Sequence, residues 1–169
     1  SFDKDYDEEL GVEFESAVFD GIRQCANHCC FCFIDQVAPH MRDTLYIKDD
    51  DYRLSFLYGN FVTLTNLSDK DFRRIAQYHL SPLFVSVPTT KMTLRENMLG
   101  TPRGRKLMEQ LERLAKEGID YHTQIVLCPG INDGKELERT LEDLADPRLN
   151  VLSAAVVPVG LTQFREGCY

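Results

Sequence analysis

Apolar segments of strand length alternate with segments of helical periodicity through the second half of the chain. Residues 83–87, 121–127 and 151–157 have the composition of strands, and 103–117 and 135–144 have the spacing of helices. Strands that alternate with helices of about 10 to 15 residues predict a parallel sheet built from β-α-β units. The alternation therefore places the chain in the α/β class.

The first half of the chain carries weaker signals. Residues 17–22 resemble a strand that runs into a group of cysteines, and 36–53 have the composition of a loop. Two further segments, 54–58 and 61–65, are rich in residues that favour strands. We therefore expect most of this half to contribute strands to the same sheet.

Ser68 is a favourable N-cap, and apolar residues at helical spacing follow it over 69–79. With the first half included, we count about five strands, which is too few for a closed barrel of eight. The expected architecture is a partial (β/α) barrel of parallel strands.

The composition suits a single soluble domain and limits its partners. The 169 residues are 43% hydrophobic and carry a net charge of −8, which argues against general nucleic-acid binding. The longest nearly apolar stretch, 151–161, has 11 residues and includes a proline, whereas a membrane-spanning helix needs about 20. Because no signal segment opens the chain, we expect a cytoplasmic protein without membrane partners.

Four of the six cysteines fall within eight residues: Cys25, Cys29, Cys30 and Cys32. Disulfides inside such a short segment would strain the backbone and stabilise little, so the group predicts a metal site. The spacing C-x3-C-x2-C offers three thiolates to a cubic iron–sulfur cluster and leaves the fourth iron without a protein ligand. Clusters with four cysteines, as in ferredoxins, only transfer electrons.

This spacing, with Phe31 just before the last cysteine, resembles the signature of the radical S-adenosylmethionine (SAM) superfamily. Segments 20–25, 46–66 and 157–161 resemble one branch of it. Full-length members of that branch carry a PDZ-like domain before the barrel and a domain of unknown function, DUF512, after it. By this resemblance, residues 1–169 are the radical SAM core of a longer enzyme, and 1–15 lead in from a preceding domain.

The resemblance implies that Cys25, Cys29 and Cys32 ligate a 4Fe-4S cluster and that S-adenosylmethionine binds the open iron. One electron would then cleave S-adenosylmethionine to methionine and a 5′-deoxyadenosyl radical, which abstracts hydrogen from a substrate that the sequence does not identify. The implied electron donor is a reductase or a flavodoxin- or ferredoxin-type protein.

The same resemblance suggests which residues contact S-adenosylmethionine, although it assigns no catalytic residue. Family members bind the methionine amino group near the position of Thr65-Asn66, and Gly59-Asn60 is the alternative. Strand alternation places Gln124 on one face with His122 and Val126. The predicted cofactor-binding residues are Phe31, Thr65, Asn66, Ser86, Gln124 and Pro158.

The sequence leaves two other functions open: an electron-transfer module with a fully ligated cluster, and a zinc-stabilised interaction domain. Cys30 is the candidate fourth ligand, but it directly follows Cys29, and we expect its side chain to point away. Zinc sites bring a second distant pair of Cys or His residues, and Cys128 and Cys168 do not form such a pair.

Three further features have plain structural interpretations. Pro88 stands where the family carries a histidine, so that role is not transferred to this chain. The acidic triplet 49–51 and the basic residues Arg103, Arg105 and Lys106 are expected to be solvated surface rather than binding sites.

Overall fold

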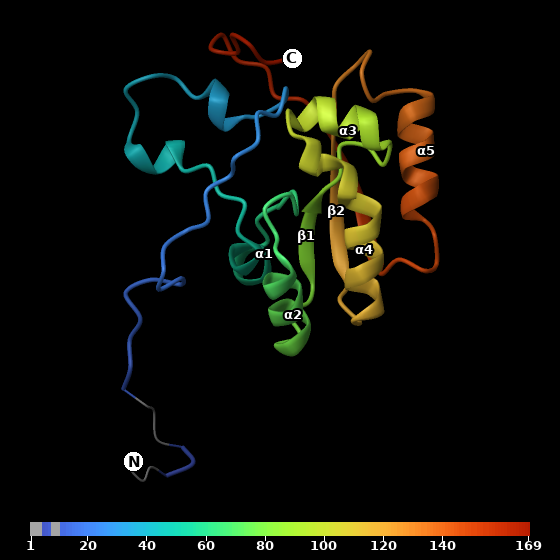
Figure 1. Ribbon diagram of the computed structural model, residues 1–169. Coiled ribbons are helices and arrows are strands. Elements are labelled where there is room, and N and C mark those ends of the chain that lie inside the picture. Colours follow the sequence, from blue (N-terminus) through green and yellow to red (C-terminus); the bar gives the residue numbers. More distant parts are fainter. Residues whose placement is uncertain (1–4, 8–10) are drawn as a thin grey trace.

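The computed structural model describes residues 5–7 and 11–169 (Figure 1). Positions 1–4 and 8–10 of the predicted lead-in lie outside these residues. Three parallel strands form the sheet of the described part, in the order β1-β2-β3: β1 (Leu83–Ser86), β2 (Tyr121–Leu127) and β3 (Val151–Pro158). The predicted α/β class and the partial β/α architecture are confirmed.

Most predicted helices are present. α2 (Asp69–Gln77) has Ser68 as its N-cap, and α5 (Lys135–Leu144) has the predicted bounds. The predicted helix over 103–117 is divided into a 3-10 turn, η3 (Pro102–Lys106), and α4 (Leu107–Lys116). α3 (Met92–Leu99), which the sequence analysis did not predict, precedes them.

Residues 54–58 form a helix, so the predicted strand there is wrong. α1 (Tyr52–Tyr58) is capped by Asp51, whose side chain accepts a hydrogen bond from the Arg53 backbone N–H, and by Gly59 at φ 75°. The apolar composition of the segment favours a strand, but caps at both ends favour a helical turn. Ser55 of α1 then binds the edge of β1 through both the N–H and the carbonyl of Phe84.

The other two strands predicted in the first half are largely absent from the described residues. Segment 61–65 makes a single parallel bridge, from Val62 to Val85, and segment 17–22 has no strand. Consequently the sheet has three strands rather than about five, and the cysteines follow an irregular segment rather than a strand. The short 3-10 turns η1 (Ile34–Gln36) and η2 (Asp43–Tyr46) interrupt the loop after them.

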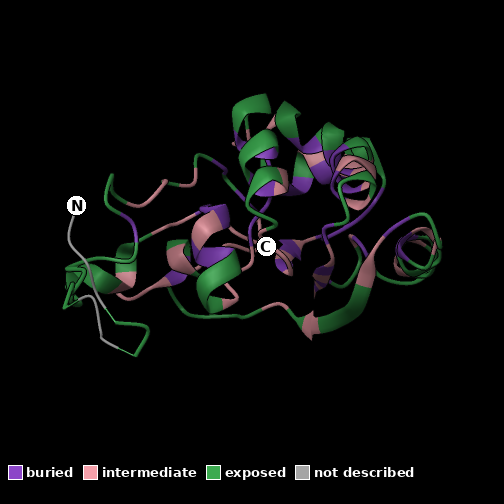
Figure 2. Cartoon of the chain, turned by 90° about the horizontal axis from the view of Figure 1, so that it is seen from below, coloured by how far each residue is buried: buried purple, intermediate pink, exposed green. Residues whose placement is uncertain are grey.

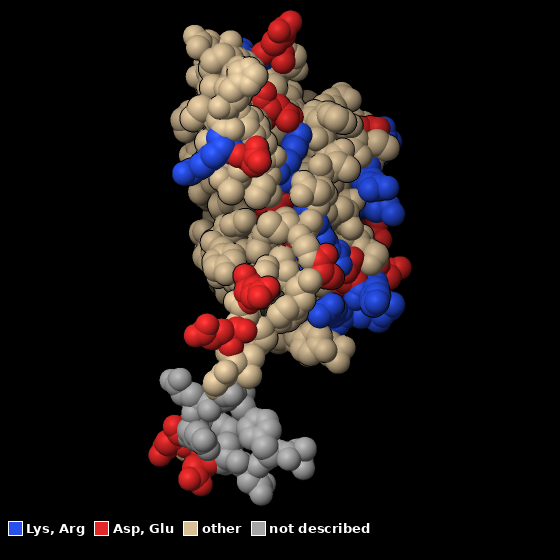
Figure 3. Space-filling view, turned by 90° about the vertical axis from the view of Figure 1, so that its left-hand side faces the viewer, with Lys and Arg blue, Asp and Glu red and all other residues tan. Residues whose placement is uncertain are grey.

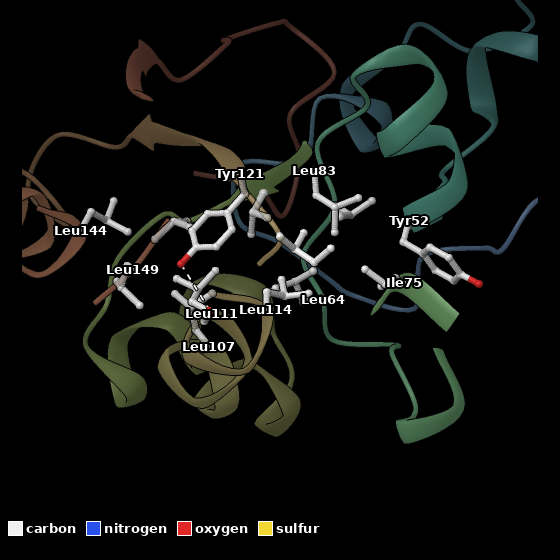
Figure 4. Close-up of a cluster of buried hydrophobic side chains, with 14 of the residues drawn as sticks. Tyr52, Leu64, Ile75, Leu83, Leu107, Leu111, Leu114, Tyr121, Leu144 and Leu149 are labelled. Atoms are coloured by element: carbon white, nitrogen blue, oxygen red, sulfur yellow. Dashed lines mark hydrogen bonds between the residues drawn. The ribbon is translucent and has the colours of Figure 1, made fainter. Parts of the chain in front are cut away.

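Alternate residues of the strands face a buried core. Leu83, Val85 and Ile125 are fully buried and pack with the leucines of α4, Leu107, Leu111 and Leu114 (Figure 4). Each buried side chain of this size contributes about 1.5–3 kcal/mol relative to its exposed state. This packing fixes which strand residues point the other way, toward the cysteine loop.

The described surface carries charges of both signs together with exposed apolar side chains. Figure 2 shows exposed residues on the outer faces of the helices and buried ones toward the interior. On the face that Figure 3 presents, acidic and basic side chains are interspersed, so the negative net charge is not gathered there. In the described part of the chain, no helix is both long and apolar enough to cross a membrane.

Candidate functional site

The cysteine loop is irregular, and backbone hydrogen bonds to distant segments hold it. The N–H of Cys25 donates to the carbonyl of Lys48 at 2.7 Å. The N–H groups of His28 and Cys30 donate to the carbonyls of Leu99 and Met98, at 3.0 and 2.9 Å. The loop therefore lies between the segment before α1 and the C-terminal end of α3.

Gly100 permits the close contact between the loop and α3. It caps α3 at φ 63°, and a Cβ added there would lie 2.8 Å from the His28 carbonyl oxygen. Any other residue would be strained by its backbone conformation and would also collide with the cysteine loop. The position of the loop thus depends on Gly100, which lies 68 positions after Cys32, the last cysteine of the loop.

One cavity of about 380 Å³ opens beside the three cysteines of the predicted ligand set. The loop contributes Cys25, Cys29, Phe31 and Cys32 to its wall. The sheet contributes Ser86, Gln124 and Val126, which alternate with the core residues of β1 and β2. The volume is in the range of small-molecule sites, about 300–1,000 Å³.

The thiols share this cavity without the close spacing of a single-ion site. In residues 5–7 and 11–169, no three His, Cys, Asp or Glu side chains form a group that would hold one metal ion. Around a tetrahedral zinc, ligand sulfurs lie about 3.8 Å apart, because each Zn–S bond is about 2.3 Å. A cubic cluster binds each cysteine to a different iron and does not require that spacing.

Burial controls the thiol pKa values. It raises the pKa of Cys25 and Cys32, and it raises that of Cys29 to about 12. Backbone N–H groups oppose the shift: Asn27 donates to the Cys25 sulfur, and Ile34 and Asp35 at η1 donate to that of Cys32. Ligation by these three residues would therefore release protons, and the thiolates of Cys25 and Cys32 would already have hydrogen-bond donors.

Cys30 belongs to a different environment from the other three cysteines of the loop. The side chain of Cys30 interacts with that of Cys128, and this interaction lowers the pKa of Cys30. Cys128 is fully buried just after β2, and Cys30 does not line the cavity. The side chain of Cys30 thus points away from the other thiols, as we expect from its place next to Cys29.

Beneath the loop lies a network of buried polar side chains around Asp50. Its carboxylate accepts hydrogen bonds from the N–H and the hydroxyl of Thr63, both at 2.6 Å. Asn27 of the cysteine loop donates to the Thr63 hydroxyl at 2.9 Å and accepts from the Thr65 hydroxyl at 3.0 Å. The network joins the loop to the segment beside β1.

The expectation that the acidic triplet is solvated is therefore wrong for two of its members. Asp50 and Asp51 are 1% and 0% exposed. Asp51 caps α1 and accepts from the side chain of Arg53 at 2.7 Å. Hydrogen bonds outweigh burial at Asp51, whose pKa is lowered, but only partly offset it at Asp50, whose pKa burial raises. A sequence pattern cannot reveal these partners.

Arg95 of α3 is a fully buried cation under the same network. Its guanidinium donates to the carbonyls of Thr63 at 2.8 Å, Ser86 at 3.2 Å and Gly104 at 2.9 Å. Burial lowers its pKa to about 10, and the nearby Asp50 carboxylate acts in the opposite direction. Arg95 thus connects α3, β1 and the polar network in one contact set.

The structure separates the six predicted cofactor-binding residues. Phe31, Ser86 and Gln124 line the cavity of the cysteines. Thr65 and Asn66 line a second hollow of about 300 Å³ near the start of α2, where Asn66 donates to the Asp50 carbonyl at 2.7 Å. Pro158 ends β3 opposite Leu127.

Other residues that line the cavity were not among the six predicted cofactor contacts. Gly59-Asn60, the alternative to Thr65-Asn66, contributes to the wall, as do Phe61 and Lys48. Lys48 and Phe61 lie within 46–66, one of the segments that resemble the family, but that resemblance assigns no individual roles. Pro88 does not line the cavity, and its carbonyl accepts a hydrogen bond from Asn132 at 2.7 Å.

Comparison with known proteins bears on this site directly. No curated protein matches the chain. Residues 4–154 match the family model of a radical SAM-like domain. The matched range includes the cysteine loop, the polar network and nearly all of the sheet. The chain therefore belongs to the radical SAM-like domain family.

Proposed function

We propose that this chain is the core of a radical SAM enzyme that holds a 4Fe-4S cluster on Cys25, Cys29 and Cys32. The observation that carries the proposal is the arrangement of the thiols. Three line one cavity, while the fourth cysteine of the loop faces Cys128. Such a set supports an iron with an open coordination site better than a fully ligated electron-transfer cluster.

The donor set fits the cluster in its chemistry. The three sulfurs are partly or largely buried, and backbone N–H groups donate to those of Cys25 and Cys32. Hydrogen bonds to cluster sulfurs and exclusion of water are two of the properties that set cluster reduction potentials. Cys30, the residue after Cys29, does not line the cavity and interacts with Cys128 instead. Three cysteines therefore remain as ligands.

Bound S-adenosylmethionine and the reduced cluster would supply reductive cleavage to methionine and a 5′-deoxyadenosyl radical, with hydrogen abstraction from an unidentified substrate. The chain's own residues would position the reactants. Ser86, Gln124 and Asn60 bring polar groups to the cavity, and Phe31 and Phe61 bring aromatic surface that excludes water. The electron would come from a reductase or a flavodoxin- or ferredoxin-type donor.

The finer features of the resemblance belong to this proposal as well. They are the PDZ-like and DUF512 flanking domains of a longer enzyme, contacts from Thr65, Asn66 and Pro158, and a cytoplasmic location. Thr65 and Asn66 line the second hollow and not the cavity of the cysteines. Contacts from these two residues would therefore require the cofactor to extend beyond that cavity.

The decisive experiment is anaerobic reconstitution with iron and sulfide, followed by reduction in the presence of S-adenosylmethionine. We expect a reduced 4Fe-4S signal in electron paramagnetic resonance, a change in that signal on adding S-adenosylmethionine, and 5′-deoxyadenosine among the products. A cluster that forms but neither responds to S-adenosylmethionine nor yields 5′-deoxyadenosine, even with flanking domains present, would contradict the proposal and support electron transfer.

Single substitutions test the ligand assignment. Cys25→Ala, Cys29→Ala and Cys32→Ala should each abolish stable cluster binding, because each removes one of three protein ligands. Cys30→Ala is the matched control, since it removes a neighbouring thiol that does not line the cavity and interacts with Cys128 instead. A cluster that survives Cys29→Ala but is lost in Cys30→Ala would overturn the assignment.

A further inference from the structure

Lys48 places a positive charge in the wall of the cavity that the three cysteines share. Among the described residues that line this cavity, it is the one cationic side chain. Its side chain is 20% exposed, so water screens the charge only partly. The backbone carbonyl of the same residue anchors the loop by accepting from the Cys25 N–H at 2.7 Å.

The ammonium group of Lys48 forms an ion pair with Asp35, a partly exposed residue close to Cys32 in the sequence. Lys48 Nζ lies 2.7 Å from Oδ2 of Asp35, three residues after Cys32, and η1 carries Asp35. The Asp35 carboxylate offsets part of the positive charge.

All three candidate ligands are exposed to the positive charge of Lys48. Lys48 lines the same cavity as Cys25, Cys29 and Cys32, and its backbone carbonyl accepts the hydrogen bond from Cys25 at the start of the loop. A cation that favours thiolates will also favour an added electron on a cluster that they hold. Charge near the cluster is one of the properties that set its potential.

We propose that Lys48 tunes the reduction potential of the cluster, raising it by stabilising the reduced form electrostatically. This inference rests on the proposed function. Lys48 acts through its charge and does not ligate the cluster. The carboxylate of Asp35 reduces the electrostatic effect of Lys48. The pair thus gives the protein two opposed groups with which to set how readily the cluster accepts one electron.

The test is a redox titration of the anaerobically reconstituted chain, followed by electron paramagnetic resonance. Lys48→Met should lower the ratio of reduced to oxidised cluster about tenfold at a fixed potential, or about 59 mV for one electron. Lys48→Arg keeps the charge and should stay within about threefold of the wild type. Lys48→Gln repeats the test in case the methionine variant loads poorly, since the backbone carbonyl is unchanged in both.

Two control variants test the direction of the shift in potential and whether it depends on a charge at the cavity. Asp35→Asn removes the opposing charge and should shift the potential in the positive direction. Lys91→Met removes a lysine that is half exposed, pairs with Glu136 at 3.8 Å and does not line the cavity, so it should leave the potential unchanged.

The outcomes separate this inference from the proposed function. If the wild-type chain forms no 4Fe-4S cluster, the proposed function itself fails. If the wild type forms the cluster and produces 5′-deoxyadenosine, but Lys48→Met has the wild-type potential, only the role of Lys48 is overturned. Weaker binding of S-adenosylmethionine in Lys48→Met at an unchanged potential would equally overturn potential tuning, because it would make Lys48 a cofactor-binding residue.

Discussion

Residues 83–158 contribute most of the buried apolar side chains, whereas residues 23–66, together with Arg95 of α3, hold a network of buried polar ones. In the first region, Leu83, Leu111 and Ile125 are fully buried in one hydrophobic cluster. In the second, Asp50 and Asp51 are buried to a similar degree and are satisfied by hydrogen bonds. The two regions meet along the edge of β1, where Val62 forms a bridge with Val85.

The difference concerns how much freedom each kind of contact leaves to the backbone. Apolar contacts are non-directional, so they favour burial without prescribing one geometry for a loop. Hydrogen bonds between buried groups are directional, and each unsatisfied group costs about 1–3 kcal/mol. The polar region can therefore position three thiols without regular secondary structure, but it should be the more sensitive region to single substitutions.

The largest expected effect is that of Arg95→Ala. It removes three hydrogen bonds to carbonyls and leaves Asp50 without its nearby cation, so we expect a loss of about 3–5 kcal/mol in the free energy of unfolding. Urea unfolding of the metal-free chain measures it. The control is Arg105→Ala, a half-exposed arginine paired with Glu96, at about 0–1 kcal/mol. A loss below about 1 kcal/mol for Arg95→Ala would show that the polar network does not depend on it.

Leu111→Ala tests the apolar region. Truncating this fully buried side chain should cost about 2–5 kcal/mol in urea unfolding, and Leu152→Ala, at an exposed site on β3, should cost far less. Measuring the iron bound per folded chain gives a second readout that distinguishes the two regions. Below the unfolding transition, Leu111→Ala should bind as much iron per folded chain as the wild type, and Arg95→Ala should bind less. Equal iron loss in both variants would contradict the division into two regions.

Gly100→Ala tests the contact between them. The added Cβ would meet the His28 carbonyl at 2.8 Å, and the φ of 63° is unfavourable for alanine, so we expect a loss of about 1–3 kcal/mol together with reduced iron binding. Gly130→Ala is the matched control, because Gly130 also has a positive φ but has nothing within 4 Å of the added Cβ. If both variants bind the same amount of iron, the close contact between Gly100 and the cysteine loop is not needed for iron binding.

The smallest effect is a pH dependence at the start of α2. Although burial opposes ionisation, hydrogen bonds from Arg23 and Ser68 hold the pKa of Asp71 below its usual range. The native state thus favours the carboxylate. Its contribution to stability is complete above the unfolded-state pKa of about 3.9 and is lost as pH falls through the native pKa.

Asp71→Asn should accordingly destabilise the chain by about 1 kcal/mol at pH 7. The difference from the wild type should shrink as unfolding is measured at successively lower pH below about 4. Asp69→Asn changes an exposed neighbour that pairs with Arg113 at the surface, so it should have the smaller effect. A difference for Asp71→Asn that stays constant from pH 7 to pH 3 would show that this carboxylate is not the titrating group.

The sequence predicted the apolar region well because its signals are local. The strand over 121–127 and the helix over 135–144 have the predicted bounds, and Ser68 caps α2 as expected. Alternation of side chains along β2 also predicted that Gln124 and Val126 share one face, and both line the cavity. Periodicity and caps are properties of neighbouring residues, so they can be detected in a single sequence.

The polar region was predicted less well because its stability comes from contacts between residues distant in sequence. Segment 54–58 has the composition of a strand but forms α1, whose Ser55 binds β1 29 positions further along the chain. Asp50 and Asp51 belong to a charge run that is usually solvated, yet their partners come from segments 12 or more residues away as well as from their own neighbours. The composition of a segment does not predict which distant residues will form hydrogen bonds with it.

The sequence by itself determined the α/β class through its alternation of strand and helix patterns, and its resemblance to known motifs gave the family and the three candidate ligands Cys25, Cys29 and Cys32. Only the tertiary structure decided that Cys30 interacts with Cys128, that Lys48 and Asn60 join the cysteines at one cavity, and that Thr65 and Asn66 line another. The physical reason is that a side chain's environment depends on which distant groups satisfy its charge and hydrogen bonds. Those groups are chosen when the chain packs.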